Sequence, residues 1–188
     1  MKKAIKRQWE QLKTKDIFKN KYFSLREDEC RMFDGRIVPR YFTIDFSDWV
    51  QTVALDKDQN AIMVEQYRYP GKASFLEFAG GSINPGGLEA PLTAAQRELL
   101  EETGYSSNEW NYIGHHYPNP ALLSNKCHVF LATACEKTAQ QSLDQFEEIS
   151  IIKVPIAELE DRISSLAEIN SLFLATFQMV RKKIKIKK

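Results

Sequence analysis

Cysteine is scarce in this chain of 188 residues, and its three copies form no pairs along the sequence. Cys30, Cys127 and Cys135 are widely spaced and odd in number, and no CxxC motif occurs. Disulfide-rich domains carry cysteines in even number, and structural zinc sites carry them in close pairs. The pattern therefore argues against both, and we interpret the three thiols as small core or surface side chains.

The chain also has no marked excess of positive or negative charge, and it has no long hydrophobic runs. It has 26 Lys and Arg against 25 Asp and Glu, so its overall charge gives no reason to expect nucleic acid or an anionic membrane as partner. No window approaches the roughly 18 apolar residues of a membrane span, and the basic residues 1–16 lack the apolar core of a signal peptide. We therefore expect a cytoplasmic protein that acts on neither membranes nor nucleic acid.

The composition, 43% hydrophobic and 27% charged, fits one globular domain with appendages. Residues 1 to about 14 are predicted to form a short polar helix or arm, and residues 22–46 a β-hairpin turning at Asp34-Gly35-Arg36. A second β pattern over residues 49–69 precedes a glycine-rich loop. We divide the chain into an N-terminal arm and β unit at 1–48, a main domain at 49–180 and a basic tail at 181–188.

A helix is predicted over residues 91–103, because Pro91 suits a first turn and Gly104 suits the left-handed residue that ends a helix. Later strands are expected at 111–117, 127–135 and 149–156, and later helices at 156–167 and 169–183. Strands interleaved with few helices predict an α/β fold with a mixed sheet.

The segment RELLEETGY, residues 97–105, places three glutamates on one face of the predicted helix. Glu98, Glu101 and Glu102 stand at positions i, i+3 and i+4, where like charges cost about 0.2–0.5 kcal/mol per pair. A solvated acidic face is the simplest explanation. However, the preceding glycine-rich loop allows backbone to approach a ligand, and clustered carboxylates bind Mg²⁺ or Mn²⁺, which bridge to phosphates. The combination indicates phosphate chemistry.

Loop and helix together resemble the signature of the Nudix hydrolases, in which a glycine-rich loop leads to Arg-Glu-U-x-Glu-Glu-x-Gly-U, with U an apolar residue. Glu89 stands eight residues before Arg97, as in the signature, and the second half from Arg97 to Tyr105 matches in full. Gly81 lies eight residues before Glu89, two more than in the signature. This spacing indicates a two-residue insertion in the GGLE stretch, residues 86–89.

The resemblance covers about residues 49–178, and residues 64–70 and 75–81 are similar to the subgroup that cleaves ADP-ribose and related nucleoside diphosphate sugars. It implies an α/β/α sandwich with a mixed β-sheet and an N-terminal β unit. In this subgroup that unit exchanges between subunits, so residues 1–48 are expected to serve dimerisation in a homodimer. Asn125 stands where many ADP-ribose pyrophosphatases carry a glutamate, which leaves the sugar open.

The resemblance also implies a mechanism in which metal ions activate a water that attacks phosphorus while a glutamate accepts its proton. The implied metal ligands are Glu98 and Glu102, Glu101 directly or through water, and the carbonyl of Ala79. Mg²⁺ is the expected cofactor, and Mn²⁺ is expected to substitute.

A late loop, QFEEIS at residues 145–150, supplies the general base by this resemblance. Glu147 is the better match, and Glu148 is the alternative. Arg97 is spaced to pair with Glu101, and we expect it to orient the catalytic carboxylates.

The resemblance also implies that three residues flanking or beginning the glycine-rich loop bind substrate: Arg68, Glu77 and Gly81. Plain surface charges are the alternative for the first two.

Three functions are compatible with these residues. The first is metal-dependent hydrolysis of the diphosphate of ADP-ribose or a related nucleoside diphosphate sugar, which gives a nucleoside monophosphate and a sugar phosphate. The second is Nudix hydrolysis of RNA 5′ ends or nucleoside triphosphates, favoured only by the basic tail. The third is a non-catalytic Nudix-like binding module, which would be expected to lose the signature glutamates. All of them are present, which argues against a binding module. The flanking residues 64–70 and 75–81 resemble the ADP-ribose subgroup, so we predict the first function.

Overall fold

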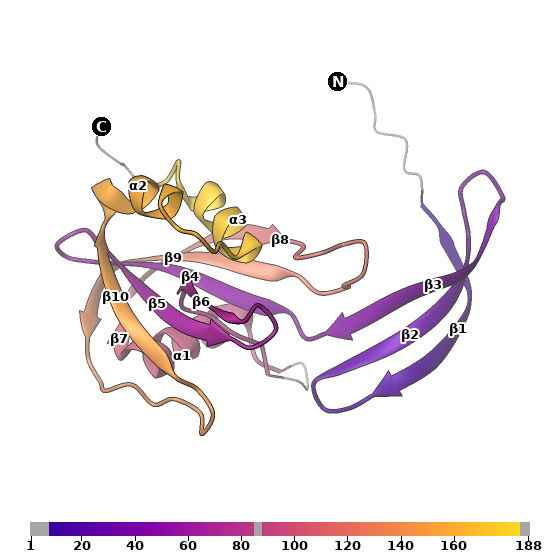
Figure 1. Ribbon diagram of the computed structural model, residues 1–188, viewed down its shortest axis with the longest axis horizontal. Coiled ribbons are helices and arrows are strands. Elements are labelled where there is room, and N and C mark those ends of the chain that lie inside the picture. Colours follow the sequence, from indigo (N-terminus) through magenta and orange to yellow (C-terminus); the bar gives the residue numbers. More distant parts are fainter. Residues whose placement is uncertain (1–7, 85–87, 185–188) are drawn as a thin grey trace. The chain divides into compact units, whose positions relative to one another are not determined.

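The computed structural model describes residues 8–84 and 88–184, which divide into two compact units (Figure 1). The described part of the N-terminal unit covers residues 8–47 and 119–125, and the remainder belongs to the main unit. Among the described helices, none is long and apolar enough to cross a membrane.

The N-terminal unit is a three-stranded antiparallel sheet in the order β1-β2-β3. Its strands are β1 (Glu10–Lys19), β2 (Phe23–Arg31) and β3 (Ile37–Phe46). The predicted hairpin is confirmed as β2 and β3, and Gly35 adopts a left-handed φ of 88° in its turn. The predicted helix is wrong from Glu10 onward, because β1 pairs along its length with β2, beginning with Glu10 opposite Arg31. Pairing with the strand that follows it overrides the local polar pattern of β1. Residues 1–7 lie outside the described part.

The main unit contains a mixed seven-stranded sheet, as predicted, with the path β10-β5-β4-β9-β7, β6 beside β5 and β8 beside β9. The pairing of β4 with β9 is parallel, and the other pairings are antiparallel. Its strands are β4 (Trp49–Asp56), β5 (Asn60–Arg68), β6 (Ala73–Phe78), β7 (Tyr105–Ser106), β8 (Glu109–His116), β9 (Cys127–Lys137) and β10 (Ile149–Pro155).

Helices cover both faces of this sheet, so the α/β/α sandwich is confirmed (Figure 1). On one face, α1 (Pro91–Thr103) buries Leu99 against the strands. On the other, a 3₁₀ turn (Ile156–Glu158), α2 (Leu159–Ser164) and α3 (Ser171–Val180) enclose a second core, in which Phe173 packs on Phe78. Helix α1 has the predicted bounds, whereas α2 and α3 are shorter than the predicted segments.

Within the start of the predicted basic tail, residues 181–183 are exposed but Ile184 is buried. Ile184 is only 6% exposed and belongs to the core beneath α2 and α3. An apolar side chain that can reach the core gains free energy by burial, even among charged neighbours. Residues 185–188 lie outside the described part, as do residues 85–87, which include part of the predicted loop insertion.

Candidate active site

Helix α1 carries the predicted acidic face against the loop that follows β6. Glu102 is only 5% exposed, and its Oε2 accepts a hydrogen bond of 2.9 Å from the backbone amide of Gly80. Burial raises the pKa of Glu102 to about 8 in spite of that bond, and the nearby charges of Glu98 and Glu147 contribute to the rise. The charged form of this buried carboxylate has one hydrogen-bond donor among the described residues, so a bound cation would stabilise it.

Glu98 lies beside the same loop, and burial again raises its pKa. A Cβ added to Gly81 would lie 2.5 Å from Oε1 of Glu98, so glycine at this position makes room for the carboxylate. The carbonyl of Ala79, the predicted fourth ligand, accepts a backbone hydrogen bond of 2.9 Å from Thr52 on β4. The loop is therefore fixed to the sheet on one side and to the glutamate helix on the other.

Arg97 joins three of the signature glutamates, Glu89, Glu98 and Glu101, into one network. Its Nη1 donates to Glu98 Oε1 at 2.9 Å and to Glu101 Oε2 at 3.0 Å, so the expected pairing with Glu101 is present. Its Nε donates to Glu89 Oε1 at 2.9 Å, and its Nη2 donates to the carbonyl of Ser82 at 3.1 Å. The guanidinium beside Glu89 holds the pKa of that carboxyl below its usual range. Glu89 thus anchors Arg97, although the loop before it departs from the family spacing.

The donor set fits a hard divalent cation. Among the described residues, no three His, Cys, Asp or Glu side chains already converge as a metal cluster. The geometry gives the reason: Arg97 draws Glu98 and Glu101 to itself, while Glu102 turns to Gly80. Carboxylate and carbonyl oxygens are nevertheless the ligands that Mg²⁺ prefers, and a cation would offset the cost of burying Glu98 and Glu102 as charged groups.

A second ion pair stands on the neighbouring strands β5 and β6. Arg68 donates from Nε to Glu77 Oε1 at 3.3 Å and from Nη2 to Glu77 Oε2 at 2.5 Å. Burial lowers the pKa of Arg68, but Glu77, and further Glu102 and Glu147, raise it above its usual value. The charges of Glu102 on α1 and Glu147 therefore act on Arg68, the residue predicted to bind substrate.

Glu147 belongs to the loop before β10 and is half-buried, whereas Glu148 is exposed. Oε2 of Glu147 accepts a hydrogen bond of 3.2 Å from the amide of Asp144. Its charge raises the pKa of both Glu98 and Glu102, so the structure places it near the predicted metal ligands.

Two amide side chains in this region were missed by sequence reasoning. Gln141 donates to the carbonyls of Glu102 at 2.7 Å and Ile149 at 3.2 Å, which ties the Glu147 loop to α1 and β10. Asn170 donates to Glu77 Oε1 at 2.8 Å. The only signal in the sequence was the position of Asn170 before a helical pattern, which indicates a helix cap and no partner on β6.

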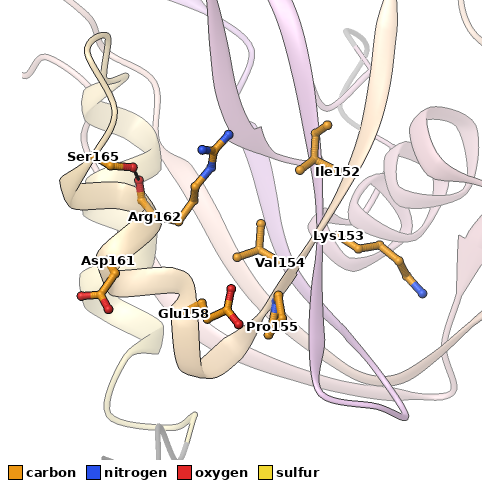
Figure 2. Close-up of a pocket in the computed structure, with 8 residues that line it drawn as sticks. All are labelled: Ile152, Lys153, Val154, Pro155, Glu158, Asp161, Arg162 and Ser165. Carbon is orange, nitrogen blue, oxygen red and sulfur yellow. Dashed lines mark hydrogen bonds between the residues drawn. The ribbon is translucent and has the colours of Figure 1, made fainter.

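Two pockets lie apart from the acidic face. One, of about 630 Å³, lies between β10 and α2, and Figure 2 shows Arg162 extending from α2 toward Ile152 while Lys153 points the other way. Its lining residues are Ile152, Lys153, Val154, Pro155, Glu158, Asp161, Arg162 and Ser165. The other, of about 490 Å³, is mostly apolar and lies at the start of α1, lined by Ala90, Pro91, Leu92, Trp110, Tyr112, His128 and Phe130. None of the predicted site residues lines either pocket.

Comparison with known families agrees with the signature and the geometry. The NUDIX domain model matches residues 49–177, and the model of the nucleoside diphosphate sugar hydrolase N-terminal domain matches residues 9–43. The chain therefore belongs to the Nudix hydrolase family.

Individual relatives and one solved structure are similar to the chain over most of its length. It is 30% identical over 168 residues to an ADP-ribose pyrophosphatase of Mycobacterium tuberculosis, covering 89% of this chain and 80% of that protein. It is 28% identical over 148 residues to a methanol dehydrogenase activator of Bacillus methanolicus, covering 78% of each. A crystal structure of an ADP compounds hydrolase superposes with a TM-score of 0.81 over 97% of both chains at 20% identity, which supports the fold.

Proposed function

We propose that this protein hydrolyses the diphosphate linkage of ADP-ribose or a related nucleoside diphosphate sugar, with Mg²⁺ as cofactor and Mn²⁺ able to substitute. The products are a nucleoside monophosphate and a sugar phosphate. The observation that carries the proposal is the packing of the carboxylates of Glu98 and Glu102 against the glycine-rich loop, where the amide of Gly80 donates to Glu102 and Gly81 leaves room for Glu98. The charges of Glu147 and Arg68 act on Glu102, which supports a site that combines a cation, a proton acceptor and an anion-binding group, as hydrolysis of a diphosphate requires.

The proposal gives each of these residues a role. Glu98, Glu102, Glu101 and the carbonyl of Ala79 would hold the metal, which when bound supplies charge neutralisation and activates water. Arg97 keeps Glu98 and Glu101 oriented through its two hydrogen bonds.

Other residues would take the proton and bind the substrate. Glu147 accepts the proton of the attacking water at its carboxylate, and Glu148 remains the alternative base. Arg68, oriented by the buried Glu77, binds a phosphate oxygen. Gly81 leaves space in which the loop, Glu98 and the diphosphate can approach closely.

The relatives support the substrate class. The M. tuberculosis relative is an ADP-ribose pyrophosphatase, and the family model for the N-terminal region is that of nucleoside diphosphate sugar hydrolases. The signature glutamates that a binding module would be expected to lose are all present. A homodimer assembled through residues 1–48 and a cytoplasmic location remain predictions, and light scattering coupled to gel filtration would test the first.

Phosphate-coupled turnover of the purified protein tests the proposal. The substrates are ADP-ribose, sugar nucleotides, dinucleoside polyphosphates, nucleoside triphosphates and 5′-triphosphorylated RNA, each with Mg²⁺, with Mn²⁺ and with a chelator. We expect selective hydrolysis of ADP-ribose or one sugar nucleotide, abolished by the chelator. Preference for triphosphates or RNA, or full activity with the chelator present, would overturn it.

A further inference from the structure

The side chain of Asn170 has two partners in different parts of the main unit. Its Oδ1 accepts a hydrogen bond of 2.9 Å from the amide of Leu172 and so caps the start of α3. Its Nδ2 donates a hydrogen bond of 2.8 Å to Oε1 of Glu77, 93 residues earlier in the chain. One amide therefore couples a helix start to a carboxylate on β6.

Glu77 is a buried carboxylate whose orientation depends on its donors. It is 3% exposed and accepts from Asn170 and from two nitrogens of Arg68. Val64 on β5 stands opposite Glu77, and Arg68 follows four positions along the same strand, so Arg68 and Glu77 project from the same face of the sheet. With Asn170 bound to Oε1, the plane of the carboxylate is fixed against the guanidinium.

The guanidinium of Arg68 is thereby held with one edge hydrogen-bonded to Glu77 and the other edge exposed. Its side chain is 45% exposed, and the bonds to Glu77 use Nε and Nη2. Within the described part of the chain, no hydrogen bond is formed by Nη1. This leaves the outer edge of the guanidinium available to an anion.

We propose that Asn170 is a positioning residue for substrate binding: it fixes Glu77, which in turn orients Arg68 so that the free edge of its guanidinium binds a phosphate oxygen of the nucleoside diphosphate. This inference rests on the proposed function and deepens it, because it assigns an orienting group that does not itself touch substrate. Without the Asn170 donor, Glu77 is bound by Arg68 alone among the described residues, so the two side chains can shift together. Arg68 should then bind the diphosphate less well while the proton transfer at Glu147 is unaffected.

Substitutions at Asn170 can separate this role from helix capping. Serine is a good helix cap but has no amide to reach Glu77, whereas alanine removes both functions. We expect Asn170→Ser and Asn170→Ala to raise KM for ADP-ribose about fivefold to tenfold with kcat within about twofold, since one buried hydrogen bond is lost. Only Asn170→Ala should clearly lower the melting temperature. Ser171→Ala, at the neighbouring exposed position, is the matched control and should leave both parameters unchanged.

A double-mutant cycle tests whether Asn170 changes KM through Glu77 and Arg68. If Asn170 acts through Glu77 and Arg68, then Asn170→Ser in an Arg68→Ala background should raise KM no further. A KM for Asn170→Ser within twofold of wild type, or additive effects in the cycle, would overturn the inference while leaving the proposed function intact.

A wild-type protein without activity on any diphosphate would refute the proposed function instead. In that case, calorimetric titration with inorganic diphosphate decides the inference. Weaker binding by Asn170→Ser than by Ser171→Ala supports it, and equal binding overturns it.

Discussion

An ion pair in the N-terminal sheet and an ion pair in the main unit differ in length and in surroundings. In Lys13–Glu29, at 3.2 Å, the side chains are 75% and 30% exposed. In Arg68–Glu77, at 2.5 Å, the carboxylate side is only 4% exposed. Water screens the first pair, whereas the second keeps its directional bonds because few other partners can reach Glu77. We infer that an ion pair holds its partner in a fixed orientation mainly when its carboxylate is buried. The presence of a pair alone is less important.

The largest effect should come from the acidic face of α1, where burial is combined with chemistry. Glu98→Gln removes a charge at nearly constant shape, so we expect turnover to fall by roughly a thousandfold, about 4 kcal/mol in barrier height. Folding should be retained, because the neutral amide is less costly to bury than the carboxylate. Steady-state kinetics with circular dichroism checks this, and near-normal turnover would contradict the metal assignment.

Glu147 is half-buried and Glu148 is exposed, so this loop allows a more buried carboxylate to be compared with an exposed one. Glu147→Gln should lower kcat by about a hundredfold with metal binding mostly intact, since general base catalysis contributes on that order. Glu148→Gln is the control and should change kcat little. If only Glu148→Gln lowers kcat, then the base is Glu148.

The pair of Asp56 with Lys153 has a buried carboxylate but no role in the proposed hydrolysis. It is 5% exposed and accepts from Lys153 at 2.8 Å and from the amide of Asn60 at 2.8 Å. Burial raises the pKa of Asp56, but these partners lower it overall, below its ordinary value of 3.8. The unfolded chain therefore binds the proton more readily, so this stability is present above pH 3.8 and is lost as pH falls through the folded-state pKa.

Asp56→Asn should accordingly lower the free energy of unfolding at pH 7 by about 1–2 kcal/mol. The difference from wild type should shrink at pH values below 3.8. Urea unfolding at neutral and acid pH measures this. A difference that does not depend on pH would show that the charge of Asp56 is irrelevant.

The smallest effect is expected in the N-terminal sheet. Lys13→Ala removes an exposed pair, so the melting temperature should change by less than about 2 °C. Differential scanning fluorimetry at low and high salt checks this. A shift comparable to that of Asp56→Asn would remove the distinction between exposed and buried pairs.

Local signals made much of the fold and part of the site predictable. The ends of α1 follow from Pro91 and from Gly104, whose φ is 72°, because these residues act on their immediate neighbours. Its acidic face follows from helical periodicity alone. The strand β1 was missed because its polar sequence carries no local β pattern and its pairing partner begins several residues later, at Phe23.

Contacts between distant segments escaped prediction for a related reason. Spacing suggested that Arg97 pairs with Glu101, but not that the same guanidinium also binds Glu89 and Glu98. Gln141 and Asn170 are ordinary polar residues in sequence, and only their partners on α1, β10 and β6 give them a role.

The sequence by itself determined the family, the α/β class and the chemical groups available for the reaction, because these depend on residue type and short spacing. The tertiary structure alone decided which carboxylates are buried, which raises the pKa of Glu102 to about 8, and which amide orients Glu77. Burial and hydrogen bonding depend on what other segments bring to a side chain, and no short stretch of sequence contains that information.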